Sequence, residues 1–246
     1  MSILQGKRAL VTGASRGIGA AIAKALAAEG AVVAITYEHS EEKALKVVEQ
    51  IVSGGGTAVA LRANSADPEQ VIRSIGQAVS ELGGLDILVN NAAIGWQGSF
   101  EEMPLESIDA LLNVNVRAVM LASQAAIGHF SEGGRIISIG SALGERVPFG
   151  GVTAYSATKS ALRSFTAGLS RELAPRGITV NLVQPGSTDT DSNPASGPGA
   201  DAQKSTIPTG RFNRPEDIAA AVVFLAGPNS EQITGTTLTV DGGAIA

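Results

Sequence analysis

Apolar runs and helical repeats alternate along the chain from end to end. Short, mostly apolar runs typical of strands buried on both faces occupy residues 8–11, 32–37, 58–62, 85–90, 135–139, 179–183 and 237–240. Apolar residues recur at helical spacing between them, over residues 18–29, 41–53, 68–82, 104–130, 154–175 and 215–226. A strand that alternates with a helix leads to the next parallel strand through a right-handed crossover. The pattern therefore predicts an α/β fold, a doubly wound parallel sheet of about seven strands with helices on both faces.

The chain has 246 residues, of which 44% are hydrophobic, and it contains no cysteine. This length suits one domain, residues 1–246, and no repeat or change of composition marks a second. Without cysteine there are no thiolate ligands, and His39 and His129 lack the neighbours of a metal site, so we expect no metal. No signal peptide follows Met1, and we judge no apolar run long enough to span a bilayer. We expect a cytoplasmic protein with no membrane partner.

The net charge of the chain is −5. A nucleic-acid surface needs a basic patch that neutralises phosphates, and the sequence shows no such patch. We therefore expect no nucleic-acid partner, and Arg16 is better explained by one bound nucleotide.

Tyr155 and Lys159 stand four residues apart at the start of a predicted helix, which places them on one face. A lysine ammonium held near a phenol favours the phenolate, so it should lower the pKa of the tyrosine towards neutrality. Such a tyrosine can give or take a proton, which is acid/base chemistry for a carbonyl or an alcohol. The pair alone is weak evidence, because the same spacing occurs by chance on many helices.

A glycine-rich turn follows the first predicted strand and precedes a helical repeat, with Gly13, Gly17 and Gly19 in a G-x-x-x-G-x-G pattern. Glycine permits positive φ and lets a pyrophosphate approach the helix N-terminus, where free N–H groups and the helix dipole favour negative charge. The pattern indicates a dinucleotide site, and an ordinary strand-to-helix turn is the alternative.

Further motifs lie close after predicted strands or within the long helix. They are Asn90, Asn91, Ala92 and Ala93, then Asn113, Val114 and Asn115, then Ser141, then Pro185 and Gly186. With the glycine turn and the tyrosine–lysine pair, the sequence resembles the short-chain dehydrogenase/reductases over essentially its whole length. The resemblance implies a single Rossmann-type domain. The chain departs from the family at Ala93, where glycine is usual, and in a stretch before Tyr155 that is about one residue longer than in many relatives.

The resemblance implies roles for Asn115, Ser141, Tyr155 and Lys159. Tyr155 would be the general acid/base, while Ser141 would hydrogen-bond the carbonyl oxygen as negative charge develops on it. Lys159 would lower the pKa of Tyr155 and hold the nicotinamide ribose. Asn115, rather than Asn113, would hold a water beside Lys159.

The resemblance also implies a set of cofactor-binding residues. They are Gly13, Ser15, Arg16, Gly17, Ile18, Gly19, Tyr37, Ser40, Asn64, Ser65, Asn91, Ala92, Ala93, Tyr155, Lys159, Pro185, Gly186, Thr188 and Thr190.

Cofactor choice depends on the residues after the second strand. NAD enzymes usually place an acidic residue there for the ribose 2′-hydroxyl, and this position falls on Tyr37. Arg16, with Ser15 and Ser40 nearby, suits a 2′-phosphate instead, so we favour NADP(H). Glu38 is the contrary evidence, because a shift of one residue would make it an NAD carboxylate, and NAD(H) remains the alternative.

Residues 187–207 begin with a polar stretch, rich in glycine and proline, that lacks apolar periodicity. Its place directly after a strand that leads into the active crevice favours a mobile substrate lid over an inert surface loop.

An apolar substrate pocket is expected from Ala93, Ile94, Trp96, Leu143, Val147 and Phe149. Such a pocket suits a ketone or aldehyde with a hydrophobic body, so the sequence predicts an NADPH-dependent carbonyl reductase. The family also includes 3-oxoacyl-carrier-protein reductases, but residues 125–133 lack the lysine and arginine that an acidic carrier would need.

A rival function comes from a bacterial subgroup described as cyclic-di-GMP-binding biofilm dispersal mediators, which the residues from Val183 to Ala195 resemble. A complete Ser141, Tyr155 and Lys159 set would be superfluous in a pure binder, so we rank the enzyme first. Relatives are generally tetramers built on long helices, and we expect a homotetramer.

Overall fold

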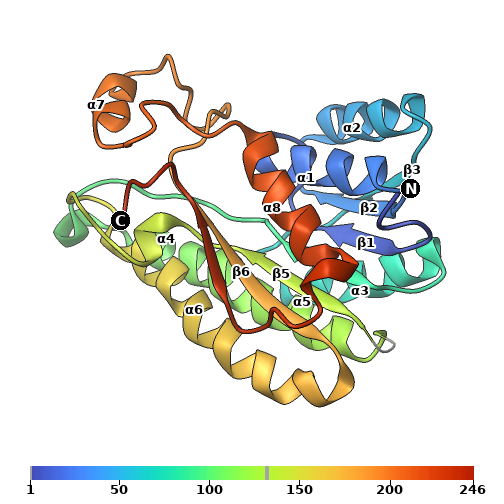
Figure 1. The fold of residues 1–246 in the computed structure, drawn as a ribbon. Coiled ribbons are helices and arrows are strands. Elements are labelled where there is room, and N and C mark those ends of the chain that lie inside the picture. The colour runs from blue at the N-terminus through green and yellow to red at the C-terminus, as the bar shows by residue number, and fades with distance from the viewer. Residues whose placement is uncertain (1, 131–132) are drawn as a thin grey trace.

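The computed structural model describes residues 2–130 and 133–246. In this part of the chain seven parallel strands form one sheet in the order β3-β2-β1-β4-β5-β6-β7 (Figure 1). The strand order reverses at β1, which pairs with β2 on one side and with β4 on the other. The strands are β1 (Arg8–Val11), β2 (Val32–Tyr37), β3 (Thr57–Arg62), β4 (Ile87–Asn90), β5 (Arg135–Ile139), β6 (Thr179–Pro185) and β7 (Thr237–Val240).

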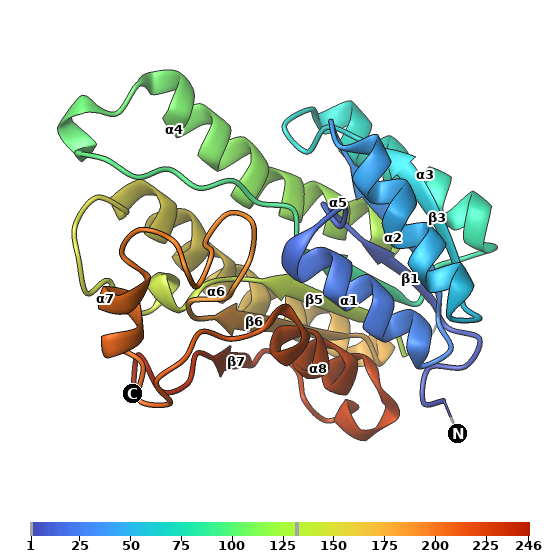
Figure 2. The ribbon, with the colours of Figure 1, turned by 90° about the horizontal axis from the view of Figure 1, so that it is seen from above.

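Helices cover both faces of the sheet (Figures 1 and 2). One face carries α1 (Gly17–Ala28), α2 (Glu41–Ser53) and α8 (Pro215–Ala226). The other carries α3 (Pro68–Leu82), α4 (Leu105–Leu112), α5 (Ala118–Ile127) and α6 (Thr153–Leu173). A short helix, α7 (Ala200–Ser205), stands apart near the carboxyl ends of the strands (Figure 1). The predicted doubly wound fold is confirmed.

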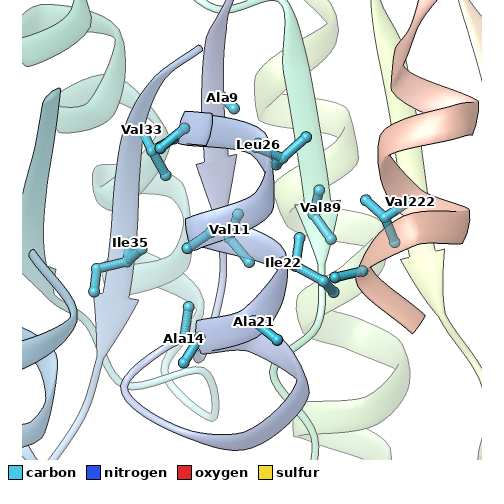
Figure 3. Close-up of a cluster of buried hydrophobic side chains, with 14 of the residues drawn as sticks. Ala9, Val11, Ala14, Ala21, Ile22, Leu26, Val33, Ile35, Val89 and Val222 are labelled. Carbon is cyan, nitrogen blue, oxygen red and sulfur yellow. The ribbon is translucent and has the colours of Figure 1, made fainter. Parts of the chain in front are cut away.

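Alternation along the strands divides the interior into two cores. In β1, Ala9 and Val11 belong to the core beneath α1, where Ile22 and Leu26 cover them (Figure 3). Leu10, which lies between them in the chain, packs into the core on the opposite face. Successive side chains of a strand point to opposite faces, so a sheet covered on both sides requires continuous apolar runs.

The predicted helix of residues 104–130 forms α4 and α5, which are joined by a π-helical turn at Asn113–Arg117. Such a turn inserts one extra residue and changes the face that the following helix presents. The interruption falls on Asn115, one of the predicted site residues.

Our expectation that no apolar run is long enough to span a bilayer is wrong, because one helix has the length and the composition to do so. The continuous helix Leu105–Ile127 has 23 residues, and the mean hydropathy of its most apolar window is 1.3. This helix packs against α3, α6 and β4, and 44% of that window is buried. One helix of this kind does not by itself indicate a membrane span, because core helices of soluble proteins can have the same length and hydropathy.

The predicted lid, residues 187–207, has more anchoring than its composition indicates. Ala200, Ile207 and Phe212 are buried together in a small apolar cluster that also includes the partly buried Ala195 and Ala244. The apolar residues are too few and too widely spaced to form a periodic pattern, so sequence inspection could not find this cluster.

Candidate active site

A cavity of about 350 Å³ opens at the carboxyl ends of β1 to β4. Its walls come from the segments that follow these four strands, from Val114 of the π-helical turn, and from Thr190 and Ser192 of the lid. Most of the predicted cofactor residues meet here, as expected for a sheet of parallel strands. They are Gly13, Ser15, Arg16, Gly17, Ile18, Gly19, Tyr37, Ser40, Ser65, Asn91, Ala92, Ala93 and Thr190.

The loops after β1 and β4 are in close contact on one side of this cavity. Gly13 has a φ of +63°, and a Cβ placed on it would lie 2.8 Å from the Cα of Ala92. The Nδ2 of Asn91 donates to the backbone carbonyls of Thr12 and Gly13, at 2.9 Å each. Only glycine combines this backbone conformation with this clearance, which explains the residue type at position 13.

The N-terminus of α1 has the features of an anion site. No side chain caps its free backbone N–H groups, and its first turn holds no acidic residue. Gly17 and Gly19, at this end of the helix, keep the backbone bare. Free N–H groups and the positive end of the helix dipole fit a pyrophosphate, so the described residues suit a dinucleotide.

Two threonines that the sequence analysis did not select hold this turn in place. Thr12 Oγ1 accepts the backbone N–H groups of Asn91 at 3.0 Å and Ala92 at 3.1 Å. Thr36 Oγ1 accepts the N–H of Gly13 at 3.0 Å. In the sequence, the only sign of this role is that each threonine lies at the end of an apolar run. The groups that its hydroxyl contacts are known only once the neighbouring strands are packed together.

Ser141, Tyr155 and Lys159 come together past the carboxyl end of β5, the strand next to β4 in the sheet. Ser141 follows β5, and Tyr155 lies in the first turn of α6. The Lys159 ammonium lies 5.9 Å from the centre of the Tyr155 ring and donates to the backbone carbonyl of Ile139 at 2.9 Å. Lys159 is only 3% exposed. The predicted common face is therefore present in the structure.

The predicted lowering of the Tyr155 pKa is not present in this structure. Burial raises the pKa of the phenol above its ordinary value, and a hydrogen bond with Ser141 only partly opposes this rise. Burial also lowers the pKa of Lys159 to about 8. Both shifts have the same physical cause, since a low-dielectric site disfavours each charged form. Tyr155 is therefore a neutral phenol that can donate a proton.

Asn115 connects the cavity to the tyrosine–lysine pair. Its Oδ1 accepts the N–H of Ile94 at 2.9 Å, and its Nδ2 donates to the Ile94 carbonyl at 2.9 Å and to Thr158 Oγ1 at 3.1 Å. Both amide protons are thus used within the protein. The Asn115 side chain therefore holds the segment after β4 against α6. A water beside Lys159 could not be held by the amide protons of Asn115 alone, because Ile94 and Thr158 already accept them.

Some predicted cofactor residues do not line this cavity, namely Asn64, Tyr155, Lys159, Pro185, Gly186 and Thr188. The Oδ1 of Asn64 accepts the N–H of Ala66 at 2.7 Å, so it shapes the turn after β3. Thr188 donates to the carbonyl of Gly186 at 3.0 Å. Their contacts with a cofactor stay predictions.

Glu38 and His39, which we did not place among the ligands, do line the cavity. His39 Nε2 lies 3.1 Å from Glu38 Oε1. Tyr37 donates instead to Glu41 Oε1 at 3.0 Å, so its hydroxyl is engaged within the protein.

Across residues 2–130 and 133–246, no group of three or more histidine, aspartate or glutamate side chains could hold a metal ion.

A family model described as Enoyl-(Acyl carrier protein) reductase matches residues 13–244, which include the glycine turn and the tyrosine–lysine pair. The chain belongs to the short-chain dehydrogenase/reductase family of oxidoreductases. The resemblance inferred from the motifs is thereby confirmed.

Solved and sequenced members of the short-chain dehydrogenase/reductase family match nearly the whole chain. A short-chain dehydrogenase from Burkholderia cenocepacia J2315, in complex with NADP, is 58% identical with a TM-score of 0.98, covering 99% of this chain and 100% of that one. A cyclic-di-GMP-binding biofilm dispersal mediator protein of Escherichia coli K12 is 44% identical over 98% of each chain. The 3-oxoacyl-[acyl-carrier-protein] reductase FabG of Staphylococcus aureus is 42% identical, covering 96% of this chain and 97% of that relative.

The buried Lys159 leads to a prediction about stability and pH. Because its pKa falls from 10.5 to about 8 on folding, the unfolded chain binds more protons between these values. The contribution of Lys159 to the free energy of unfolding must then rise with pH across this window. We expect wild type to gain about 1–2 kcal/mol between pH 7.5 and 9.5 relative to Lys159→Met, measured by urea denaturation.

Lys24→Met, which removes an exposed lysine of α1, is the control and should keep the wild-type dependence on pH. Parallel curves for wild type and Lys159→Met would show that the buried ammonium does not carry this shift.

Proposed function

We propose that this protein is an NADPH-dependent reductase that converts a ketone or aldehyde to an alcohol, reversibly. The observation that carries the proposal is the partly buried, neutral Tyr155 beside Ser141, with Lys159 on the same helix face. A neutral phenol is the form that gives a proton to a carbonyl oxygen during reduction.

The residues of the site divide the chemistry between them. The bound cofactor supplies the hydride, which is added to the carbonyl carbon. Tyr155 gives its phenolic proton to the carbonyl oxygen, and Ser141 donates a hydrogen bond to the same oxygen as negative charge develops there. Lys159 would hold the ribose of the bound cofactor, and its ammonium would stabilise the phenolate left on Tyr155 until that oxygen is protonated again.

NADP(H) is favoured over NAD(H) by the charges around the adenosine end. Arg16 lies in the cavity wall, while Tyr37 occupies the position where an NAD enzyme usually has a carboxylate. Glu38 is the opposing charge, and His39 lies against its carboxylate at 3.1 Å. The Burkholderia relative, which is 58% identical, was solved with NADP, and this supports the same preference.

The substrate class follows from the apolar side chains expected around the crevice. Ile94, Val147 and Phe149 are 39%, 50% and 50% exposed. Exposed apolar side chains of this size are typical of surfaces that bind an apolar ligand. The backbone N–H of Gly98 donates to the carbonyl of Gly151 at 2.9 Å, so the two loops that carry these residues are tied together. We propose a carbonyl substrate with a hydrophobic body.

The second candidate function is binding of cyclic-di-GMP, which the 44% identical Escherichia coli relative supports by its name. The complete Ser141, Tyr155 and Lys159 set favours the enzyme, because a pure binder needs no proton donor. A tight cyclic dinucleotide complex without NADPH consumption on a ketone panel would reverse this order.

The FabG relative makes a carrier-bound 3-oxoacyl substrate a third candidate. Against it, residues 125–130 and 133 include no lysine or arginine, and Ser131 and Glu132 lie outside the described residues.

Tyr155→Phe tests the proposed proton donor. The variant keeps the ring and loses the acidic proton, so we expect kcat with a ketone and NADPH to fall by at least roughly two orders of magnitude. Cofactor affinity, measured by fluorescence titration, should stay near that of wild type. Turnover close to wild type would remove Tyr155 from the role of general acid.

Arg16→Ala tests the cofactor preference. Loss of a charge-assisted contact with the 2′-phosphate should lower kcat/KM for NADPH by roughly ten- to a hundredfold and spare NADH. Since Arg16 also donates to Ser192 at 2.7 Å, Ser192→Ala is the matched control that breaks this contact without removing the charge. A wild type that prefers NADH would instead indicate that Glu38 holds the ribose.

A homotetramer is proposed from the apolar surface of α4 and α5. Leu105, Leu112 and Met120 are 69%, 48% and 41% exposed in the single chain, and burial between copies would remove this area from water. We expect light scattering at micromolar concentration to give the mass of a tetramer. A monomer under these conditions would contradict the proposal.

A further inference from the structure

The lid engages two basic side chains at the nucleotide end of the site. Arg16 Nη1 donates to Ser192 Oγ at 2.7 Å, and Lys43 Nζ donates to Asp191 Oδ2 at 3.1 Å. Asp191 and Ser192 are adjacent, so one short piece of the lid makes both contacts. In Figure 2 this segment, drawn in orange, extends towards the start of α1.

The same piece of the lid lies against the glycine turn. Thr190 Cγ2 would be 3.5 Å from a Cβ placed at Gly17, and Thr190 and Ser192 both line the cavity. The lid therefore closes over the α1 N-terminus, which is where the described residues suit a pyrophosphate.

The charges near Arg16 are unfavourable for a phosphate dianion unless a further cation takes part. Glu38 lines the cavity, and α2 begins with Glu41 and Glu42. Asp191 adds a fourth carboxylate from the lid. Lys43 is the next residue of α2, and its side chain reaches this group of charges by its contact with Asp191.

Asp191 is an anion that interacts with both cations. Lys43 lowers the pKa of the Asp191 carboxyl most strongly, through a hydrogen bond and through its charge, and the charge of Arg16 lowers it further. The four side chains Arg16, Lys43, Asp191 and Ser192 thus form one polar cluster between lid and nucleotide end. A phosphate placed beside Arg16 would be repelled by Asp191 and attracted by Lys43.

We propose that Lys43 is a second cationic ligand of the cofactor 2′-phosphate, and that Asp191 of the lid competes with this phosphate for Lys43. This inference rests on the proposed use of NADP(H). Binding of NADP(H) then exchanges the Lys43–Asp191 contact for a Lys43–phosphate contact, whereas NAD(H) leaves the lid contact in place. Lys43 and Asp191 are accordingly specificity-determining residues that lie outside the wall of the cavity.

The expected effects are small, because both partners are accessible to solvent. The Lys43 and Asp191 side chains are 56% and 63% exposed. Exposed ion pairs contribute little to binding, so we expect changes of about two- to fivefold in a dissociation constant.

The test is calorimetric titration of the full chain with NADP+ and with NAD+, which measures binding independently of turnover. Asp191→Asn should tighten NADP+ by about two- to fivefold, and Lys43→Gln should weaken it by a similar factor. NAD+ should bind both variants as it binds wild type. In the double variant Lys43→Gln/Asp191→Asn, most of the gain from Asp191→Asn should disappear, because the freed ammonium is absent.

Two matched controls separate this effect from a general change of surface charge. Lys46→Gln removes another exposed lysine of α2, and Asp201→Asn removes a carboxylate of α7 whose partner is Lys204 within the lid. Neither should change the ratio of the NADP+ and NAD+ dissociation constants.

The outcomes distinguish this inference from the proposed function. A wild-type preference for NADP+ that stays the same in Lys43→Gln overturns the role of Lys43 and leaves the cofactor proposal intact. Equal changes for NADP+ and NAD+ in Asp191→Asn mean that the contact only holds the lid, and they also overturn the inference. A wild type without any preference for NADP+ overturns the cofactor proposal and this inference together.

Discussion

The site depends on the close contact between the loop after β1 and the loop after β4. A Cβ at position 13 would lie 2.8 Å from the Cα of Ala92, so the two backbones meet without a side chain between them. Thr12 and Asn91 then satisfy the exposed backbone groups on both sides. Because α1 begins four residues after Gly13, this contact fixes where its free N–H groups point. Both the bare glycine backbone and the anion site follow from it.

The buried lysine at the other end of the crevice shows the cost of such a site. Lys159 is 3% exposed, and its one described hydrogen-bond acceptor is the carbonyl of Ile139. Burial lowers the pKa of Lys159 and raises the pKa of Tyr155, so it disfavours the charged form of each side chain. In the proposed mechanism, a phenolate formed on Tyr155 would be compensated by the buried Lys159 ammonium in a low-dielectric site. The same burial is expected to lower the free energy of unfolding at neutral pH, as is common at functional sites.

The lid differs from the scaffold because polar contacts hold much of it in place. Within residues 187–207 the apolar cluster anchors α7, while Asp191 and Ser192 reach α1 and α2 through exposed hydrogen bonds. Contacts of this kind are weak and exchangeable, as the proposed role of a lid would require. The sheet, by contrast, is covered by two continuous apolar cores.

The sequence by itself determined the fold class, the family and the common helix face of Tyr155 and Lys159, because these depend on local periodicity and short motifs. Apolar runs and helical repeats follow from which faces are buried, and a four-residue spacing puts Tyr155 and Lys159 on one helix face whatever surrounds them. The tertiary structure alone decided the raised pKa of Tyr155, which comes from burial by distant segments. It also decided the hydrogen bond of Thr36 with Gly13 and the pairing of Lys43 with Asp191, 148 residues away. Such contacts join residues far apart in the chain, and no local pattern encodes which partner folding will bring near.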